Sequence, residues 1–494
     1  MAKKSLLTFA VSLLAVGALA SCGPTSNPST EGSFGPSDES TTSLPSGEEI
    51  TIEFYSTFNQ DMHSQIQSHI DEFEAIILRE EGVKINFNFS KQGGYDEVAD
   101  KIGKGFSTGI YPTLAVVYPD NVAGFIDRAP ENVADISVYA NDENIGFGKD
   151  TIADLHDDYE LSDAYVSAFV NEGVNYATEG MYSFPFLKST EILAYDPTLV
   201  HSITIPELNG GRQLNKRFME NITWDDFVKI LEYIKANNEG DDGFNVRWPA
   251  YYDSDSNLFI TKLMQNNIPF IQNADNPGDK VLFNNDAAKA EVTAIKDLHD
   301  RGLLMTKGAN ANQYGSNYFT KSEIVFSISS SGGAGYMDLG GDVDVEVVKV
   351  PYDNAPSYVS QGPTLCVLRH PNQANDELKV KYAFRLIKYL TTSEINAGLA
   401  VNSGGYIPVN KYSYDTEQYQ HFLYSETNEN NVLSKNARCV LESVNGAFYN
   451  LPSFKGSAQI RDAVGGIITE VLTGIRTVDE AFSRAQEQSI LACK

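Results

Sequence analysis

A strand–helix–strand pattern opens the folded part of the chain and restricts it to few architectures. Residues 50–55 (ITIEFY) alternate in polarity and are rich in β-branched side chains, which predicts a strand. Apolar residues at helical spacing predict a helix over 62–77, and a second alternating strand follows over 83–89. A unit of this kind pairs its strands in parallel and covers them with helices. We therefore predict an α/β fold.

The chain is too long for a single lobe. It has 494 residues, whereas one hydrophobic core rarely serves more than about 250–300. Short apolar strands are expected again over 113–118 and 324–328, and amphipathic helices over 286–301 and 377–390. Capping patterns at helix starts support further helices, as at Thr477. No fixed-period repeat interrupts this order, so we predict an α/β body with more than one lobe.

The beginning of the chain has a different character. Two lysines precede an apolar run from Leu6 to Leu19, and small residues then lead to Cys22. This order resembles the lipobox of bacterial lipoproteins, in which the signal peptide is cleaved before a cysteine that receives a diacylglyceryl group. We predict a lipoprotein signal peptide over 1–21 and lipidation of Cys22. The alternative is an ordinary secretory signal with a chance cysteine.

Residues 22–49 form the next predicted segment. Ser, Thr, Gly and Pro dominate it, and it has no apolar periodicity. Such a composition cannot bury enough apolar surface to fold, so we expect a disordered tether between the lipid and the body. No later apolar stretch approaches the length of about 20 residues that a membrane span needs. The predicted location is the extracellular face of a bacterial membrane, with the lipid as the only anchor.

The charge excludes some partners. The chain carries 66 Asp and Glu against 37 Lys and Arg, a formal net charge of −29. A surface this acidic repels the phosphates of nucleic acids and anionic lipid head groups. We therefore expect no nucleic-acid partner, and no electrostatic adsorption to the membrane beside which the body is tethered.

The three remaining cysteines show no metal or redox spacing. Cys366 lies in an apolar run and is expected to be a buried strand thiol. A bridge between Cys439 and Cys493 is left open, but the fold is not expected to depend on disulfides.

Catalytic and metal-binding signatures are sparse. None of the seven histidines forms a paired ligand motif, and no nucleophile elbow or phosphate loop occurs. Asp253, Asp255 and Asn257 copy the first half of a calcium loop, but Leu258 stands where glycine is needed and Met264 where a glutamate belongs. We predict no cofactor, no metal and no enzyme activity. A glycosidase-like carboxylate pair stays open, because pairs are uninformative among so many acids.

Seven segments in order carry a resemblance to a family. They are similar to motifs of the extracellular solute-binding proteins of family 1, the sugar-binding subunits of ABC importers. The segments are 50–77, 109–118 (GIYPTLAVVY), 181–185 (MYSFP) with 189–196 (STEILAYD), 223–227 (TWDDF), 319–326 (FTKSEIVF), 405–409 (GYIPV) and 474–482. The sequence departs from the family pattern at Thr113, where Asp is usual, and at Ser322, where Gly is usual.

The resemblance implies a two-lobed, periplasmic-binding-protein-like fold of type II, with a central ligand cleft. Crossing strands would join the lobes around 189–193 and 360–362, and the lobes would close on the ligand. The implied lobe ranges are 50–190 with 363–410 for lobe one, and 191–362 with 411–494 for lobe two.

The cleft residues can be proposed from the same resemblance, because sugars need aromatic rings for their C–H faces and polar groups for their hydroxyls. Tyr118, Tyr252 and Tyr406 are the strongest candidates. The full set is Phe58, Asn59, Asp61, Tyr118, Asp120, Asn121, Lys188, Ser189, Tyr251, Tyr252, Asp253, Ser330, Ser331, Gly332 and Tyr406. No Trp occurs at 330–332, so the stacking platform typical of maltodextrin binders is not expected there.

These expectations describe a monomeric binding protein that performs no chemistry and delivers a carbohydrate, in the first instance an oligosaccharide, to the permease of an ABC importer. The same fold binding a peptide, a polyamine or a phosphorylated sugar is the first alternative. A secreted glycoside hydrolase and a surface adhesin are the others.

Overall fold

This computed structural model describes residues 49–240, 243–340, 343–428, 430–444, 446 and 448–494. The fold lies in the unit Gly47–Lys494. The predicted signal peptide, Cys22 and nearly all of the predicted tether lie outside the described residues. Among the helices that the model describes, none combines the length and the apolar character that crossing a bilayer requires.

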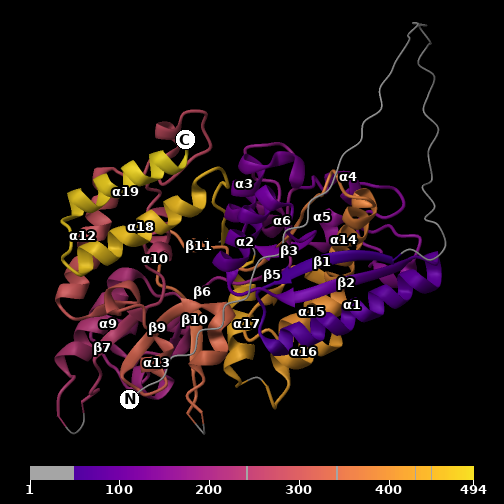
Figure 1. Cartoon of the computed structure of the whole chain (residues 1–494). Coiled ribbons are helices and arrows are strands. Elements are labelled where there is room, and N and C mark those ends of the chain that lie inside the picture. The colour runs from indigo at the N-terminus through magenta and orange to yellow at the C-terminus, as the bar shows by residue number, and fades with distance from the viewer. Residues whose placement is uncertain (1–48, 241–242, 341–342, 429, 445, 447) are drawn as a thin grey trace, which may run out of the picture. The chain divides into compact units, whose positions relative to one another are not determined.

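The first sheet contains the predicted strand–helix–strand unit (Figure 1). Strand β1 (Glu49–Ser56) pairs in parallel with β2 (Lys84–Lys91) and with β3 (Leu114–Val117). Helix α1 (Gln60–Glu81) joins β1 to β2 and buries one face. The order is β2-β1-β3-β12-β4, in which the last two strands come from elsewhere in the chain. The α/β prediction is confirmed here.

Two distant segments complete that sheet. Strand β12 (Thr364–Val367) runs antiparallel to β3 and to β4 (Phe184–Pro185). The sheet therefore recruits residues from about 250 positions after β3, which local sequence pattern alone does not reveal. A core cluster that includes Val98, Val117 and Cys366 packs on it.

The second sheet has the order β10-β6-β9-β7-β8. Its strands are β6 (Glu191–Tyr195), β7 (Trp248–Tyr252), β8 (Leu304–Thr306), β9 (Ile324–Ser330) and β10 (Glu346–Lys349). Strand β7 is parallel to β8 and β9, whereas β6 is antiparallel to both of its neighbours. The five helices α9 (Trp224–Ala236), α10 (Asp255–Gln265), α12 (Asp286–Asp300), α18 (Ser457–Leu472) and α19 (Val478–Ala492) share its core cluster (Figure 1).

The remaining elements are short or lie around the two sheets. The helices are α2 (Tyr95–Thr108), α3 (Pro119–Arg128), α4 (Ser137–Ala140), α5 (Leu161–Ala164), α6 (Ser167–Glu172), α7 (Pro197–Val200), α8 (Lys216–Met219), α11 (Pro277–Lys280), α13 (Ser316–Phe319), α14 (Asp376–Leu390), α15 (Ser393–Val401), α16 (Glu417–Tyr424) and α17 (Val432–Ser443). Strands β5 (Leu187–Lys188) and β13 (Ile407–Pro408) form one pair, and β11 (Tyr358–Val359) and β14 (Phe448–Tyr449) form another. The 3₁₀ helices are Pro130–Asn132, Ala153–Leu155, Asn209–Gly211, Gly308–Asn310, Ser331–Met337 and Lys411–Asp415.

Two chain segments run between the sheets side by side. Ser189 and Gln361 exchange two backbone hydrogen bonds of 2.9 Å each. Gly362 follows with φ +110, and a Cβ there would lie 2.5 Å from the carbonyl oxygen of Leu187, so only glycine permits this close approach. The lobe boundaries themselves stay a prediction, since α16 lies in the range expected for lobe two but packs on α15 from the range expected for lobe one.

Helix ends follow the expected chemistry. Gly82 ends α1 in the left-handed conformation with φ 70. The Thr223 hydroxyl accepts from the Asp226 amide at 3.2 Å, and Thr477 forms a capping box with Glu480. These predicted helix starts are confirmed.

All three described cysteines are buried and unbridged. Cys366 is fully buried in β12, as expected. The bridge left open between Cys439 and Cys493 is not formed. Burial raises the pKa of Cys439 to about 12 and also raises the pKa of Cys366.

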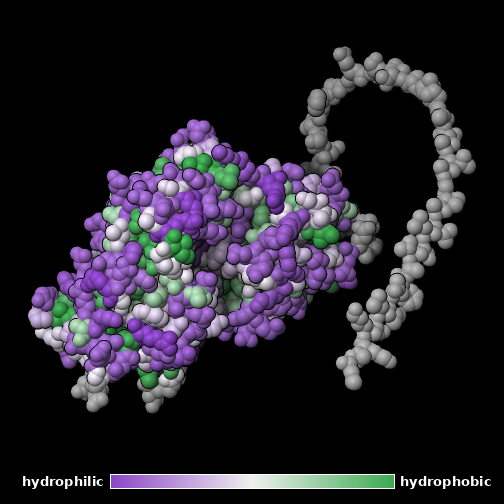
Figure 2. Space-filling view, turned by 60° about the vertical axis from the view of Figure 1, so that its left-hand side comes forward, coloured by the Kyte–Doolittle hydropathy of each residue, from purple (hydrophilic) through white to green (hydrophobic). Residues whose placement is uncertain are grey.

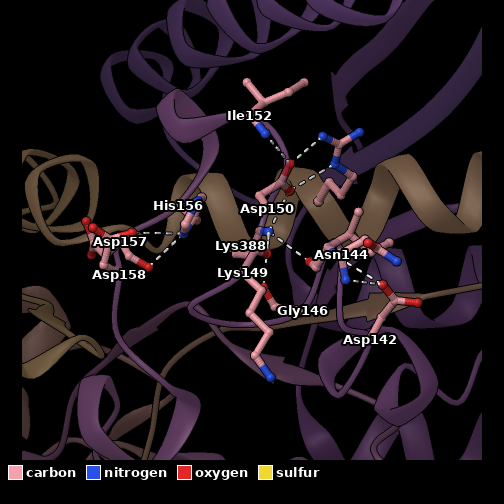
Figure 3. Close-up of polar contacts among 12 residues, drawn as sticks. Asp142, Asn144, Gly146, Lys149, Asp150, Ile152, His156, Asp157, Asp158 and Lys388 are labelled. Atoms are coloured by element: carbon pink, nitrogen blue, oxygen red, sulfur yellow. Dashed lines mark hydrogen bonds and ion pairs between the residues drawn. The ribbon is translucent and has the colours of Figure 1, made fainter.

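A buried ionic network fixes the segment 142–150 to α14 (Figure 3). The Lys388 ammonium lies at its centre. It donates to four oxygens, namely the carbonyls of Ile145 at 2.8 Å, Gly146 at 3.2 Å and Lys149 at 2.9 Å, and Asp150 Oδ2 at 2.6 Å. The other carboxylate oxygen of Asp150 accepts from Arg385 at 2.7 Å, and Arg385 also binds Glu81 at 2.6 Å. Burial alone would raise the pKa of Asp150, but the bonds from Arg385 and Lys388 lower it on balance.

Candidate functional site

The folded unit encloses one large cavity with a volume of about 850 Å³. Figure 2 shows a mostly hydrophilic surface with a hollow near the middle of this unit. The cavity is lined at the carboxyl ends of β3, β7 and β9, by Tyr118, Asp253 and Ser330, and by the crossing residues around Gln361. Ligands of open α/β sheets bind at such carboxyl edges. The cavity is therefore the candidate ligand site.

Tyr118 and Tyr406 line one wall of the cavity, and Tyr95 contacts both of them from outside the lining. The rings of Tyr95 and Tyr118 lie 4.3 Å apart between centroids, and Tyr95 shares a hydrogen bond with Tyr406. Gly332 faces the Tyr406 ring, since a Cβ at position 332 would lie 2.9 Å from Tyr406 Cζ. Burial raises the pKa of Tyr118 and of Tyr406, so both remain neutral phenols. This wall offers aromatic faces and phenolic hydroxyls together.

Asp120 connects this wall to α18. It lies in the first turn of α3, and its Oδ1 accepts from the hydroxyls of Ser453 and Ser457, each at 3.3 Å. Burial raises the pKa of Asp120, while Arg461 and the two serines lower it. Asn121 stabilises the start of α3, because its side chain accepts from the Tyr118 amide at 3.1 Å. The first wall is thus fixed by local capping and by contacts from a segment over 330 residues away.

Asp253 lies on the opposite wall, just after β7. Its Oδ1 accepts from the Gly315 amide at 2.6 Å. Burial raises the pKa of Asp253 to about 6, although the Gly315 bond and the nearby Lys307 lower it. The Lys307 ammonium lies 3.7 Å from the centroid of the Tyr314 ring. This wall presents a carboxylate, a cation and an exposed aromatic ring to the cavity.

Carboxylates outnumber cations around the cavity. Its lining includes five acidic side chains (Asp96, Asp120, Glu172, Asp253 and Asp462) and three basic ones (Lys188, Lys307 and Arg461). The cavity therefore disfavours an anionic ligand more than a neutral or cationic one.

Eight of the predicted contact residues line this cavity. They are Tyr118, Asp120, Asn121, Lys188, Asp253, Ser330, Gly332 and Tyr406. Their contact with a ligand stays a prediction.

The other seven predicted residues lie outside the cavity lining of the described chain: Phe58, Asn59, Asp61, Ser189, Tyr251, Tyr252 and Ser331. Tyr252 is fully buried, and its hydroxyl donates to Glu191 at 2.7 Å. Tyr251 donates to the carbonyl of Gln313 at 2.6 Å. Both rings are buried because β7 lies inside its sheet, between β9 and β8, and side chains on both of its faces are buried.

The remaining displaced residues have structural roles. Phe58 packs on Phe186 at 5.7 Å between ring centroids. Asn59 caps α1 by accepting from the Met62 amide at 3.0 Å, and Asp61 is exposed in the first turn of that helix. The Ser331 hydroxyl accepts from the Thr190 amide at 3.1 Å, and Ser189 is buried in the crossing.

Several cavity residues were not expected from the sequence. They include Asp96, Glu172, Lys307, Ser360, Asn450 and Arg461. Ser360 lies in a predicted crossing strand, and the others lie in segments whose local pattern predicts only helix or loop. Asn450 and Arg461 come from the last tenth of the chain, and only the long-range topology brings them to the site.

The partial calcium motif has other partners. The Asp255 carboxylate accepts from the Thr469 hydroxyl at 2.5 Å, and the Asn257 side chain accepts from Arg461. Among the described residues, no three His, Cys, Asp or Glu side chains gather as metal ligands do.

We compared the chain with protein-family models and with known proteins. The family model described as bacterial extracellular solute-binding protein matches residues 69–423. A search of curated proteins by sequence gave no match.

Solved structures share the fold at low sequence identity. The GacH receptor of Streptomyces glaucescens, solved unliganded and with acarbose, is 16% identical with a TM-score of 0.62, over 90% of this chain and 99% of that one. A substrate-binding protein of Listeria monocytogenes with cycloalternan is 14% identical with a TM-score of 0.65, over 90% and 98%. UgpB of Mycobacterium tuberculosis with glycerophosphocholine is 15% identical with a TM-score of 0.64, over 89% and 98%. The predicted two-lobed, periplasmic-binding-protein-like fold is confirmed by these likenesses.

Proposed function

The chain belongs to the bacterial extracellular solute-binding proteins, and we propose that it captures a carbohydrate, an oligosaccharide in the first instance, for an ABC importer. The observation that carries this proposal is that Tyr118 and Tyr406, supported from behind by Tyr95, line a cavity that also presents carboxylates and hydroxyls. Sugar rings present C–H faces that pack on aromatic rings, and hydroxyls that need both donors and acceptors. The volume of about 850 Å³ falls within the usual range for ligand pockets.

The protein's own role in this proposal is binding without chemistry. The ligand would be held between the walls from the two sheets, and closure about the crossing segments would present the loaded form to the permease. Relatives of known structure support the carbohydrate class, since two of them were solved with oligosaccharides or an acarbose ligand.

A polyamine is the second candidate ligand. The excess of five carboxylates over three cations around the cavity favours a cationic ligand over a phosphorylated one. The tyrosine wall serves this candidate also, because cations bind over aromatic faces.

A ligand screen separates these candidates. Purified body is heated with neutral mono- to pentasaccharides, with spermidine and with glucose 6-phosphate, and any sugar that raises the melting temperature is incubated and checked for products. The carbohydrate proposal expects stabilisation by a neutral sugar without turnover. Stabilisation by spermidine alone would replace it with the polyamine candidate, and sugar cleavage would make the protein a hydrolase. If no small ligand stabilised it, an adhesin would be the better description.

One substitution tests the tyrosine wall directly. Tyr118→Ala should weaken binding of the stabilising sugar about tenfold, because it removes the stacking face. Tyr424→Ala is the matched control, since Tyr424 is 58% exposed and is not part of the cavity lining. Isothermal titration calorimetry measures both. Equal affinities for the two variants would remove Tyr118 from the site.

The membrane address is a separate part of the proposal. We infer that the mature protein begins at Cys22 and is held on the extracellular face of the membrane by its lipid. The order of basic residues, apolar run and Cys22 supports this inference. Full-length protein expressed in a bacterium should partition into the detergent phase, and Cys22→Ala should move it to the aqueous phase. If both proteins partitioned equally, lipidation of Cys22 would be contradicted, and an ordinary secretory signal would be the better description.

A further inference from the structure

Four polar residues line the cavity beside the crossing segments. Glu172 ends α6, Lys188 ends β5, Ser360 follows β11, and Asn450 follows β14. Backbone contacts bring them together, since Gly362 approaches Lys188 closely and the Ser360 amide donates to the Tyr449 carbonyl at 3.1 Å. We call these four residues the floor cluster.

An ion pair forms the centre of the floor cluster. Lys188 Nζ lies 2.5 Å from Glu172 Oε2, and the two side chains are only 1% and 11% exposed. The ammonium also lies 5.7 Å from the centroid of the Phe169 ring. An ammonium has three N–H donors, and Glu172 is the only acceptor that Lys188 reaches among the described residues. The pair is therefore neutral as a whole, but N–H donors of Lys188 remain without an acceptor among the described residues.

The other polar atoms of the floor cluster lack partners. Within the described part of the chain, Glu172 Oε1, Ser360 Oγ and Asn450 Oδ1 are all buried without a hydrogen bond. The Asn450 amide is oriented by a bond from its Nδ2 to the carbonyl of Ala168, so its oxygen is the end left over. Buried polar atoms are nearly always hydrogen-bonded. The three exceptions belong to residues that line the cavity, as the ion pair does, and this coincidence points to a position for a bound polar group.

The charge balance restricts what that group can be. A phosphate or an ammonium placed here would add an uncompensated charge beside a buried pair that already neutralises itself, which is costly. A neutral group must instead donate to Glu172 Oε1 and Asn450 Oδ1 and accept from Lys188. Two adjacent hydroxyls of a sugar ring do both, because each hydroxyl is a donor and an acceptor.

We propose that the floor cluster is the subsite that binds a vicinal diol of the ligand, so that one sugar ring enters the cavity with its hydroxyls towards the crossing segments. The proposal rests on the carbohydrate function proposed above and adds which chemical group is recognised and where. It makes Glu172, Lys188, Ser360 and Asn450 residues that determine specificity. A ligand phosphorylated or fully methylated at that diol is excluded.

Two variants and a matched control test the subsite by calorimetry, with the neutral saccharide panel and with glucose 6-phosphate. Ser360→Ala removes an unpartnered hydroxyl, so it should leave the unliganded melting temperature unchanged and weaken sugar binding about three- to tenfold. Glu172→Gln leaves Lys188 positive, so it should weaken the neutral sugar at least tenfold and allow glucose 6-phosphate to bind. Ser327→Ala is the control, because Ser327 Oγ is equally buried and unpartnered among the described residues but lies outside the cavity lining.

The outcomes separate the two proposals. If the wild-type protein binds no neutral saccharide, the carbohydrate function fails and the diol subsite fails with it. If the wild-type protein binds one but Ser360→Ala and Glu172→Gln match the affinity of Ser327→Ala, only the subsite fails. The subsite is supported if both variants bind the sugar more weakly while Ser327→Ala keeps the wild-type affinity. Each variant must also be folded at the temperature of the measurement, as its melting temperature shows.

Discussion

Lys388 and Lys188 are both buried lysines paired with an acid, but they are partnered very differently. Lys388 reaches four oxygens, three from the 145–149 backbone and one from Asp150 (Figure 3). Lys188 reaches Glu172 alone among the described residues, and unpartnered oxygens surround it. The first ammonium is saturated by the fold. The second uses one of its three donors within the described fold, and the difference separates a group that holds structure from one that can receive a ligand.

The comparison also predicts how much stability is lost when each lysine is replaced. A saturated buried charge cannot be removed without leaving several polar atoms without partners. An unsaturated pair that faces a cavity can be replaced with little loss to the fold, because part of its hydrogen-bonding capacity was never used within it. Three predictions test this contrast, from the largest effect to the smallest.

Lys388→Met should cause the largest loss. It leaves the Asp150 carboxylate with Arg385 and the Ile152 amide, and it removes the Lys388 donor from the carbonyls of Ile145, Gly146 and Lys149. The free energy of unfolding should therefore fall by about 3–5 kcal/mol. Urea unfolding followed by circular dichroism measures it. Lys379→Met, on the same helix but with a single exposed contact to Gln373, is the control and should change stability by less than about 0.5 kcal/mol. Similar losses for both variants would contradict the structural role of the network.

Glu191 tests a buried acid at the start of the crossing strand β6. Burial raises its pKa to about 7 from an ordinary 4.5, although bonds from Tyr252, Asn257 and Thr261 lower it. Because the pKa is raised in the folded state, the folded protein binds a proton at Glu191 more tightly than the unfolded chain does. The contribution of the protonated Glu191 to the free energy of unfolding is therefore complete below pH 4.5 and is lost as the pH rises to about 7. Relative to Glu191→Gln, the wild-type protein should lose up to about 3 kcal/mol over that window.

Unfolding free energies of the two proteins at intervals from pH 4 to pH 8 measure this effect. Other titrating groups contribute equally to both proteins and cancel in the difference. A difference that stayed constant with pH would show that folding does not shift the pKa of Glu191.

The double variant Lys188→Met/Glu172→Gln should have the smallest effect on stability. Replacing a buried ion pair by neutral residues of similar size is often close to neutral, so unfolding should change by less than about 1 kcal/mol. The same variant should lose binding of the neutral sugar that stabilises the wild-type protein. A stability loss as large as that of Lys388→Met would place both lysines in the same structural class.

Much of the fold could be predicted from local pattern. The βαβ opening, the buried face of α1 and the start of α19 at Thr477 all follow from spacing and capping, which act over a few residues. The insertion of β12 beside β3 could not be predicted in this way, because the pairing joins segments about 250 residues apart. Nothing in TLCV specifies which apolar strand lies next to it.

The site was predictable in part, on both walls. Tyr118 and Asp120 follow an apolar strand directly, so the local sequence predicts the turn that places them at the cavity. Tyr252 has the same local signature but is buried, because β7 is central and Glu191 takes its hydroxyl. Of the floor cluster, the sequence predicted Lys188 alone, since Glu172 and Asn450 are separated by 278 positions and resemble ordinary helix-end and loop residues.

The three buried thiols have a practical consequence. Their burial, and the raised pKa that it gives Cys366 and Cys439, keeps the reactive thiolate scarce in the native protein. Without residues 1–22, the folded body offers almost no background to maleimide dyes. One engineered surface cysteine beside each sheet would then carry a donor and an acceptor fluorophore, and single-molecule energy transfer could follow domain motion in real time.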